Sequence, residues 1–273
     1  MTMQVPDTQA AGAAAARTPR ARITAVTSGK GGVGKTFLAA NLAASLARQG
    51  QRVLVLDADL GLANLDVVLN LFPKITLHHV FTGKAQLEEA ILPAPGGFSV
   101  LLAGSGMVEY SRLTPEVRER LHETLETVAP RYDHVLLDTG AGISDVVLYA
   151  VSLADDVLVV ATPEPTSLTD AYATIKVLAS QQQRQVIKLV VNQVGRLGEG
   201  RAMRAQLQAV MDRYVSNGTD TPVRLDLLGD VPHDPSVREA VQKRQLLVST
   251  MPGCEAAKAV AVVADKLAAW PHA

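Results

Sequence analysis

Short apolar runs rich in β-branched residues alternate along the chain with longer segments whose apolar side chains recur at helical spacing. Strands are expected at residues 22–27, 53–57, 98–104, 134–138, 155–162, 186–194 and 225–232. Helices are expected from about Lys35, Thr114 and Ser167, over residues 199–214, in one stretch between the second and third strands, and in two segments near the C-terminus. This alternation predicts an α/β fold in which helices flank both faces of a mostly parallel twisted sheet.

The chain is expected to form one domain over residues 21–273, preceded by a flexible tail at residues 1–20. The tail is rich in alanine and contains Pro6 and Pro19, a composition that does not favour a packed core. Residues 93–97 are rich in proline and glycine and are expected to form a loop that leads into the third strand.

Composition narrows the class of protein. Of the 273 residues, 48% are hydrophobic and 19% are charged, which is typical of a soluble globular protein, and the net charge of −1 offers no overall attraction to nucleic acid. No uncharged apolar run approaches the length of a membrane span. The single cysteine, Cys254, excludes an internal disulfide and an iron–sulfur site built from one chain's cysteines. We therefore expect a cytoplasmic protein.

A glycine-rich segment that follows the first expected strand matches the phosphate-loop pattern G-x-x-x-x-G-K-[ST]. Glycines let backbone N–H groups converge on phosphate oxygens, and a helix N-terminus adds a favourable partial charge. Lys35 is expected to reach the β- and γ-phosphates, and the Thr36 hydroxyl to ligate Mg²⁺. The expected nucleotide-binding segment comprises Gly29, Lys30, Gly31, Gly32, Val33, Gly34, Lys35, Thr36 and Phe37.

The same glycines also fit G-x-G-x-x-G, the pattern of a dinucleotide-binding oxidoreductase, with Asp57 ending the second strand. Lys35 and Thr36 have no role in that alternative. A second acid, Asp138, follows an apolar strand in the Walker-B arrangement, where a carboxylate holds Mg²⁺. The combined spacing favours a nucleoside triphosphate.

The loop K-G-G-V-G-K-T resembles the deviant phosphate loop of the MinD/ParA family of ATPases, and the resemblance extends over residues 23–270. It implies that Lys30 reaches the nucleotide of a partner subunit, so that the homodimer forms with ATP bound. It also implies that Asp59 orients the attacking water, while Lys30 and Lys35 assist catalysis and Asp57 supports the Mg²⁺ shell.

The residues expected near the base favour adenine. The strand end at residues 192–195 lacks the lysine and acid of the guanine-selective signature. Asn192, Pro232 and Asp234 resemble the residues on the adenine side of the ParA-like group, which implies ATP and ADP as ligands together with Mg²⁺. Structural alternatives remain open, because Asn192 could simply end a strand and Asp234 could begin a helix.

Residues 61–71, 76–92, 136–144 and especially 162–178 look like the flagellar-number regulators of the FlhG/FleN group within this family. That resemblance implies slow ATP hydrolysis and control of flagellar number or placement. The implied partners are a flagellar GTPase, a transcription activator or basal-body switch proteins. It also suggests a peripheral location at the inner membrane or cell pole. Residues 255–270, however, fit core packing better than a membrane anchor.

Residues 7–10 match only the first part of the group's N-terminal activator segment, because no Leu-Arg follows them. Two other functions stay open. The first is a DNA- or cargo-partitioning ATPase whose positive helical face would comprise Arg201, Arg204 and Arg213, although specific nucleic-acid binding is not expected. The second is a metabolic ligase or amidase built on the same fold.

Overall fold

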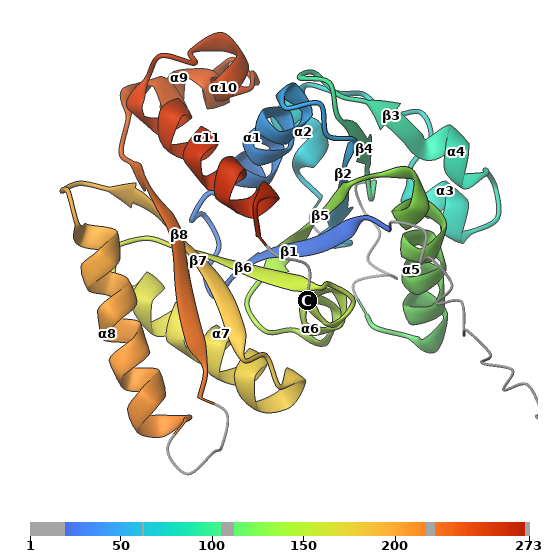
Figure 1. The fold of residues 1–273 in the computed structure, drawn as a ribbon. Coiled ribbons are helices and arrows are strands. Elements are labelled where there is room, and N and C mark those ends of the chain that lie inside the picture. The colour runs from blue at the N-terminus through green and yellow to red at the C-terminus, as the bar shows by residue number, and fades with distance from the viewer. Residues whose placement is uncertain (1–19, 62, 105–111, 217–221, 271–273) are drawn as a thin grey trace, which may run out of the picture.

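A computed structural model describes residues 20–61, 63–104, 112–216 and 222–270, and within them eight strands form one twisted sheet (Figure 1). The strand order is β3-β4-β2-β5-β1-β6-β7-β8, and all neighbouring strands are parallel except β3 and β4. The strands are β1 (Arg22–Ser28), β2 (Val53–Ala58), β3 (Ile91–Pro93), β4 (Ser99–Leu101), β5 (His134–Ala141), β6 (Asp156–Ala161), β7 (Val186–Val194) and β8 (Arg224–Pro232). The predicted α/β class with a mostly parallel sheet is confirmed.

The helices occupy the connections between the strands. They are α1 (Lys35–Arg48), α2 (Leu65–Leu69), α3 (Leu77–Phe81), α4 (Leu87–Ala90), α5 (Pro115–Val128), the 3-10 turn η2 (Ala129–Arg131), α6 (Asp145–Ser152), α7 (Pro165–Gln182), α8 (Glu199–Tyr214), α9 (Pro235–Gln242), α10 (Leu247–Thr250) and α11 (Glu255–Ala268). The stretch between β2 and the next strand forms three short helices where the sequence analysis expected one helical stretch.

Helix α7 begins at Pro165, two residues earlier than expected. Proline suits the first turn of a helix because its missing N–H would have no helical partner there. Ser167 therefore lies inside the first turn, and its hydroxyl accepts a hydrogen bond from the Thr162 N–H at 2.9 Å. The earlier start matters because it brings Glu164 and Thr166 to the edge of the phosphate loop.

The segment at residues 93–97 leads into β4 as expected, but the sequence analysis missed the antiparallel strand β3, which ends at Pro93. Strand β3 has three residues, too few for a period of two to stand out, whereas β4 lies within the strand expected at residues 98–104. Gly96 and Gly97 have φ of 93° and 86°, which lets the chain reverse direction between β3 and β4.

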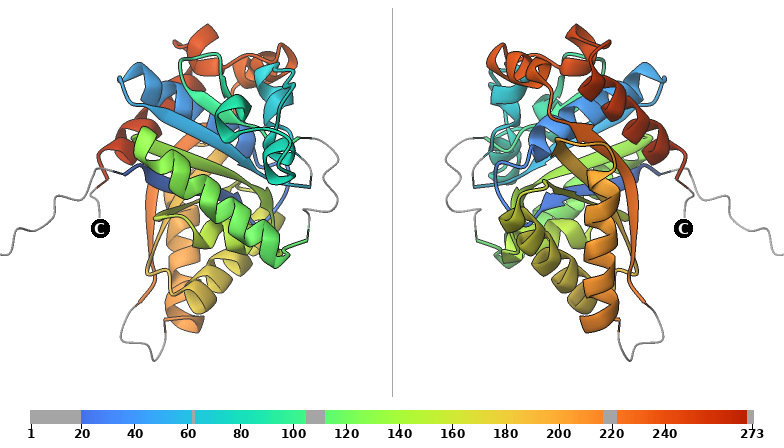
Figure 2. Two further views of the ribbon diagram at one scale, coloured as in Figure 1. Left: turned by 90° about the vertical axis from the view of Figure 1, so that its right-hand side faces the viewer. Right: turned by 90° about the vertical axis from the view of Figure 1, so that its left-hand side faces the viewer.

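The sheet separates two hydrophobic cores. Buried side chains of α5, α6, α7 and α8 pack on one face, and those of α1, α10 and α11 pack on the other. The side views in Figure 2 show the C-terminal helices in red on the opposite side of the sheet from α7 and α8. The central strands, covered on both faces, consequently read as continuous apolar runs.

Helix α11 packs into the second core, as the sequence analysis expected. Val260, Val263 and Leu267 are fully buried there. The end of the helix is held at the amino ends of the strands, where the Arg22 guanidinium donates to the Trp270 carbonyl oxygen and the Lys188 ammonium lies 4.5 Å from the centre of the Trp270 ring. Both faces of the sheet are thus covered, and the carboxyl edge of the parallel strands carries the loops that form a site.

Candidate nucleotide-binding site

The loop between β1 and α1 is shaped for an anion. Gly32 and Gly34 have φ of 79° and 95°, a region that favours glycine. No atom would lie within 4 Å of a Cβ at Gly31 or Gly32, so this part of the loop is open. Helix α1 starts directly after Gly34, and no side chain caps its first turn. Its first N–H groups can therefore bind phosphate oxygens.

Gly29, the first glycine of this loop, is required by packing against α7. A Cβ at Gly29 would lie 2.1 Å from the Asp170 carbonyl oxygen, far inside van der Waals contact. The next residue, Lys30, points to the same helix, and its ammonium lies 2.7 Å from the Glu164 carboxylate and 2.9 Å from the Thr166 hydroxyl. Lys30 is 38% exposed, so this contact lies at the surface of the protein.

Two acids predicted as Mg²⁺ ligands meet beneath the loop. Asp57 and Asp138 lie directly opposite each other in the β2–β5 pairing, and both are buried. One carboxylate oxygen of each, Oδ2 of Asp57 and Oδ1 of Asp138, has no hydrogen-bond partner among the described residues. Paired, desolvated carboxylate oxygens without donors suit a hard divalent cation, so the residues present fit Mg²⁺.

The protonation of these groups reflects their burial. Burial and the charge of Asp138 raise the pKa of Asp57 well above its ordinary value. Burial also raises the pKa of Asp138 to about 6, although a hydrogen bond from Thr36 and the charge of Lys35 oppose the shift. Burial lowers the pKa of Lys35, against the attraction of Asp138 and Asp59. A bound cation would favour the ionised form of both acids.

Asp59 lies directly after β2, beside the carboxyl end of β5 and the start of the loop that follows β5. Its backbone N–H donates to the Asp57 carboxylate at 3.1 Å. Its own carboxylate packs beside Gly140, since a Cβ at Gly140 would lie 3.4 Å from Asp59 Oδ2. The next glycine, Gly142, has φ of 86° and donates its N–H to the Ser28 carbonyl oxygen at 2.8 Å, which ties this loop to the end of β1.

The residues expected on the adenine side lie at the ends of β7 and β8. The Asn192 amide reaches the phosphate loop, where its Nδ2 donates to the Val33 carbonyl oxygen at 2.8 Å. Asp234 begins α9, and its carboxylate accepts from the backbone N–H groups of Ser236 and Ala256 at 2.8 and 3.2 Å. Pro232 pairs with Val194 as the last residue of β8. The helix-start interpretation of Asp234 is therefore correct, whereas Asn192 makes a contact that neither sequence interpretation included.

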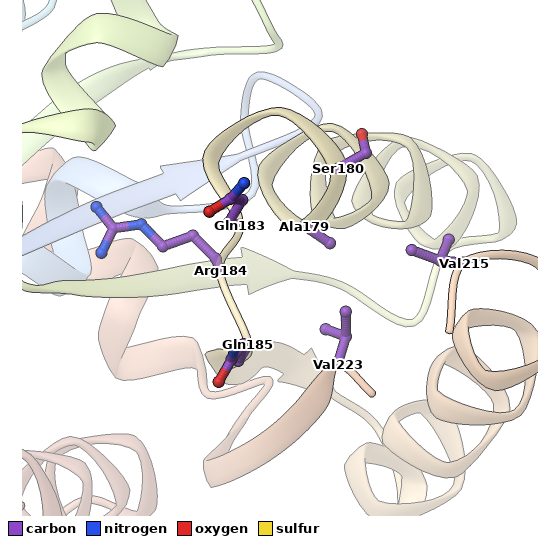
Figure 3. Close-up of a pocket in the computed structure, with 7 residues that line it drawn as sticks. All are labelled: Ala179, Ser180, Gln183, Arg184, Gln185, Val215 and Val223. Carbon is purple, nitrogen blue, oxygen red and sulfur yellow. The ribbon is translucent and has the colours of Figure 1, made fainter. Parts of the chain in front are cut away.

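A separate cavity of about 510 Å³ is lined by Ala179, Ser180, Gln183, Arg184, Gln185, Val215 and Val223 (Figure 3). The apolar side chains of Ala179, Val215 and Val223 approach one another there, while Arg184 points away from them. The Arg184 guanidinium donates to the carbonyl oxygens of Val151, Ala154 and Asp155 at 2.6–3.1 Å. The Arg184 guanidinium is therefore not directed into this cavity. The loop after β1 remains the better candidate for the phosphate-binding site.

The structure brings the expected phosphate and metal residues to one edge, and it adds partners that the sequence analysis did not find. Glu164, Thr166 and Asp170 contact the loop because β6 lies beside β1, so the chain that follows β6 passes the phosphate loop. The residues are common polar types without a distinctive spacing, and only strand order could have indicated their position.

Comparison with known proteins agrees with this arrangement. The ParA family model, described as NUBPL iron-transfer P-loop NTPase, matches residues 20–268. The chain therefore belongs to the MinD/ParA family of P-loop NTPases. The sequence contains one cysteine, Cys254, and its side chain caps α11. One chain therefore offers no set of cysteines that could hold an iron–sulfur cluster for the iron transfer named in that description.

Within the family, the chain is similar to two flagellar or regulatory proteins. It is 41% identical to the antiactivator FleN of Pseudomonas aeruginosa over 92% of this chain and 87% of that protein. It is 34% identical to the flagellum site-determining protein YlxH of Helicobacter pylori over 85% of this chain and 76% of that protein. In structure it resembles Pyrococcus horikoshii MinD complexed with Mg-ADP, with a TM-score of 0.72, 29% identity and coverage of 90% of this chain and 96% of that one.

Proposed function

We propose that this protein is an ATP-operated dimerisation switch that regulates the number or placement of flagella. The observation that carries the proposal is one edge of the sheet, where an open phosphate loop with two lysines stands above two buried acids. The similarity to FleN and to the flagellum site-determining protein YlxH supports the biological part of the proposal.

In this proposal, the first helical turn of α1 and Lys35 bind the β- and γ-phosphates. Thr36, Asp57 and Asp138 hold Mg²⁺, which neutralises charge on the phosphates when bound. Asp59 orients the water that attacks the γ-phosphate. Its place beside Gly140 supports this role, because Gly140 lies at the carboxyl end of β5, on the edge of the sheet that also carries Asp57 and Asp138.

Lys30 acts in trans, on the phosphates of the partner subunit, and thereby makes the dimer depend on ATP. Slow hydrolysis to ADP returns the subunits to the dissociated state.

Asn192, Pro232 and Asp234 line the adenine side of the site. Asp234 acts there through its backbone, because its carboxylate caps α9.

The protein would act in the cytoplasm, with a flagellar GTPase, a transcription activator or basal-body switch proteins as partners. No helix in the described residues is long and apolar enough to cross a membrane. The burial of Leu267 and the contacts of Trp270 support a packed C-terminal helix rather than an inserted one.

The test is deletion of the gene in its own host, followed by counting of flagella by electron microscopy. We expect flagella of altered number or position, restored by the wild-type gene but not by Lys35→Ala. Lys84→Ala, the same change at an exposed lysine on the loop after α3, is the matched control and should rescue. Unchanged flagella in the deletion strain would contradict the flagellar role and favour positioning of DNA or other cargo.

A further inference from the structure

The contact between Asn192 and the phosphate loop links two parts of the site that are far apart in sequence. Asn192 lies near the end of β7, two strands away from β1 in the sheet, and its side chain is only 6% exposed. Its Nδ2 donates to the Val33 carbonyl oxygen at 2.8 Å. A buried side-chain donor is thus committed to one backbone acceptor within the loop that is shaped for phosphate.

The loop is fitted closely to this amide. A Cβ at Gly34 would lie 2.4 Å from Asn192 Nδ2, so the last glycine of the loop is required by the Asn192 side chain as well as by its φ of 95°. In a trans peptide the carbonyl and the following N–H point to opposite sides. Holding the Val33 oxygen on Asn192 therefore turns the Gly34 N–H to the other side of the peptide, away from β7.

A carboxamide has two N–H hydrogens and one oxygen. One hydrogen is used on Val33, which leaves the second N–H and Oδ1 as groups that can meet the edge of a base. A single buried side chain can therefore touch the base and the phosphate loop at the same time. This capacity for two contacts distinguishes Asn192 from Pro232 and Asp234, which contact a neighbouring strand and the first turns of two helices.

We infer that Asn192 is a positioning residue for the phosphate loop, which it holds ready for the phosphates even when no base is present. This inference rests on the proposed nucleotide site and assigns to Asn192 a role beyond base contact. A loop held in this way should bind a base-free polyphosphate, and loss of the amide should weaken binding of that anion as well as of ATP.

The experiment is calorimetric titration of the full chain with Mg-ATP and, separately, with Mg²⁺ and inorganic tripolyphosphate, which has no base or ribose. Asn192→Leu removes the donor and roughly keeps the volume. Gln193→Asn changes the exposed neighbouring residue, whose φ of 60° asparagine tolerates, and is the matched control. We expect Asn192→Leu to bind tripolyphosphate about tenfold more weakly than the wild type, because a buried carbonyl loses its donor. Gln193→Asn should bind it like the wild type.

Unchanged tripolyphosphate binding by Asn192→Leu, with ATP binding reduced, would overturn the inference and leave Asn192 as a base contact alone. A wild type that binds ATP but no tripolyphosphate at millimolar concentration would also overturn it. A wild type that binds neither ligand would contradict the proposed function itself. If Asn192→Leu does not fold, NMR of the wild type decides, because tripolyphosphate should shift the Asn192 side-chain NH₂ signals. Signals that move only with ATP would refute the inference.

Discussion

Lys30 and Glu164 form an ion pair of 2.7 Å within one chain, and Thr166 adds a hydrogen bond to the same ammonium. In the proposed switch, Lys30 must instead reach the phosphates of a second subunit. The contact seen here would hold the lysine in its own chain until phosphate competes for it. Exposed ion pairs contribute between about zero and 1 kcal/mol, so the competition is one that a triphosphate can win.

The first prediction concerns Glu164→Gln, which removes the carboxylate that holds Lys30. In the wild type, the Lys30–Glu164 ion pair of each chain must break before the dimer can form. We expect the loss of each ion pair to lower the dissociation constant of the ATP-bound dimer by about twofold to fivefold. Sedimentation with Mg-ATP measures it. Glu239→Gln is the control, since Glu239 makes a similarly exposed pair with Lys243 at 2.6 Å on α9. Weaker dimerisation of Glu164→Gln would show that Glu164 supports the dimer.

A second prediction separates the two lysines of the loop. Lys35→Ala should abolish measurable ATP binding, because Lys35 stands partly buried beside Asp138 and Asp59 at the head of α1. Lys30→Ala should keep most ATP affinity and lose ATP-dependent dimerisation, since its ammonium points to the surface. Fluorescent-nucleotide titration and light scattering on both variants measure the two effects. Equal loss of ATP affinity in both variants would contradict a role in trans for Lys30.

A third prediction uses two glycines of the same loop. Gly29→Ala places a methyl group against the Asp170 carbonyl, and the overpacking should cost about 1–3 kcal/mol of the free energy of unfolding. Gly31→Ala adds the same methyl where nothing lies within 4 Å, and the stability should hardly change. Urea unfolding of the nucleotide-free proteins compares them. Similar unfolding midpoints for the two variants would mean that α7 does not press on the loop as described.

The fourth prediction concerns the buried cluster that holds the C-terminal helix. Burial would raise the pKa of Asp156, but hydrogen bonds from Arg22 and Lys188 lower it below the ordinary value. Its ionised form therefore stabilises the fold above about pH 4, the carboxyl pKa of an unfolded chain, and that stability is lost as the pH falls through the lowered pKa. Asp156→Asn should cost about 3 kcal/mol at pH 7, because two buried cations lose their partner.

The cost of Asp156→Asn should shrink as the pH falls below about 4, because the carboxyl of the unfolded wild type is protonated there while the native carboxyl, with its lowered pKa, still resists protonation. Urea unfolding across pH 3–7 follows the difference. Asp133→Asn is the control, directly before strand β5, because Asp133 pairs with the exposed Arg52 and should contribute much less. A cost for Asp156→Asn that stays constant across this pH range would contradict the assigned ion pairs.

Much of the fold was predictable because each buried parallel strand is an apolar run and each helix repeats its apolar residues. The phosphate loop, Asp57 and Asp138 were predictable for a related reason, since the loop follows such a strand and the two acids lie near the carboxyl ends of two others. The three-residue strand β3 shows no usable period and was missed, whereas β4 lies within the strand expected at residues 98–104. Contacts between loops depend on strand order, so the sequence did not indicate that Glu164 meets Lys30 or that Asn192 meets Val33.

The contacts of Lys188 were also not predictable from the sequence. A lysine within an apolar strand would ordinarily be solvent-exposed, yet Lys188 is 1% exposed, beside Asp156 and the ring of Trp270. Its partners come from β6 and from the end of α11, which are remote in sequence. A charged residue inside an apolar run is the signal that could have prompted a search for a buried pair.

The central claim is that ATP, and not ADP, joins two copies of this chain. Asp59→Ala should hydrolyse ATP too slowly to reset the switch, and light scattering of this variant gives the most direct test. With Mg-ATP we predict about twice the chain mass of 28.9 kDa, and with Mg-ADP the mass of one chain. The same mass with both nucleotides, although both bind, would contradict the account.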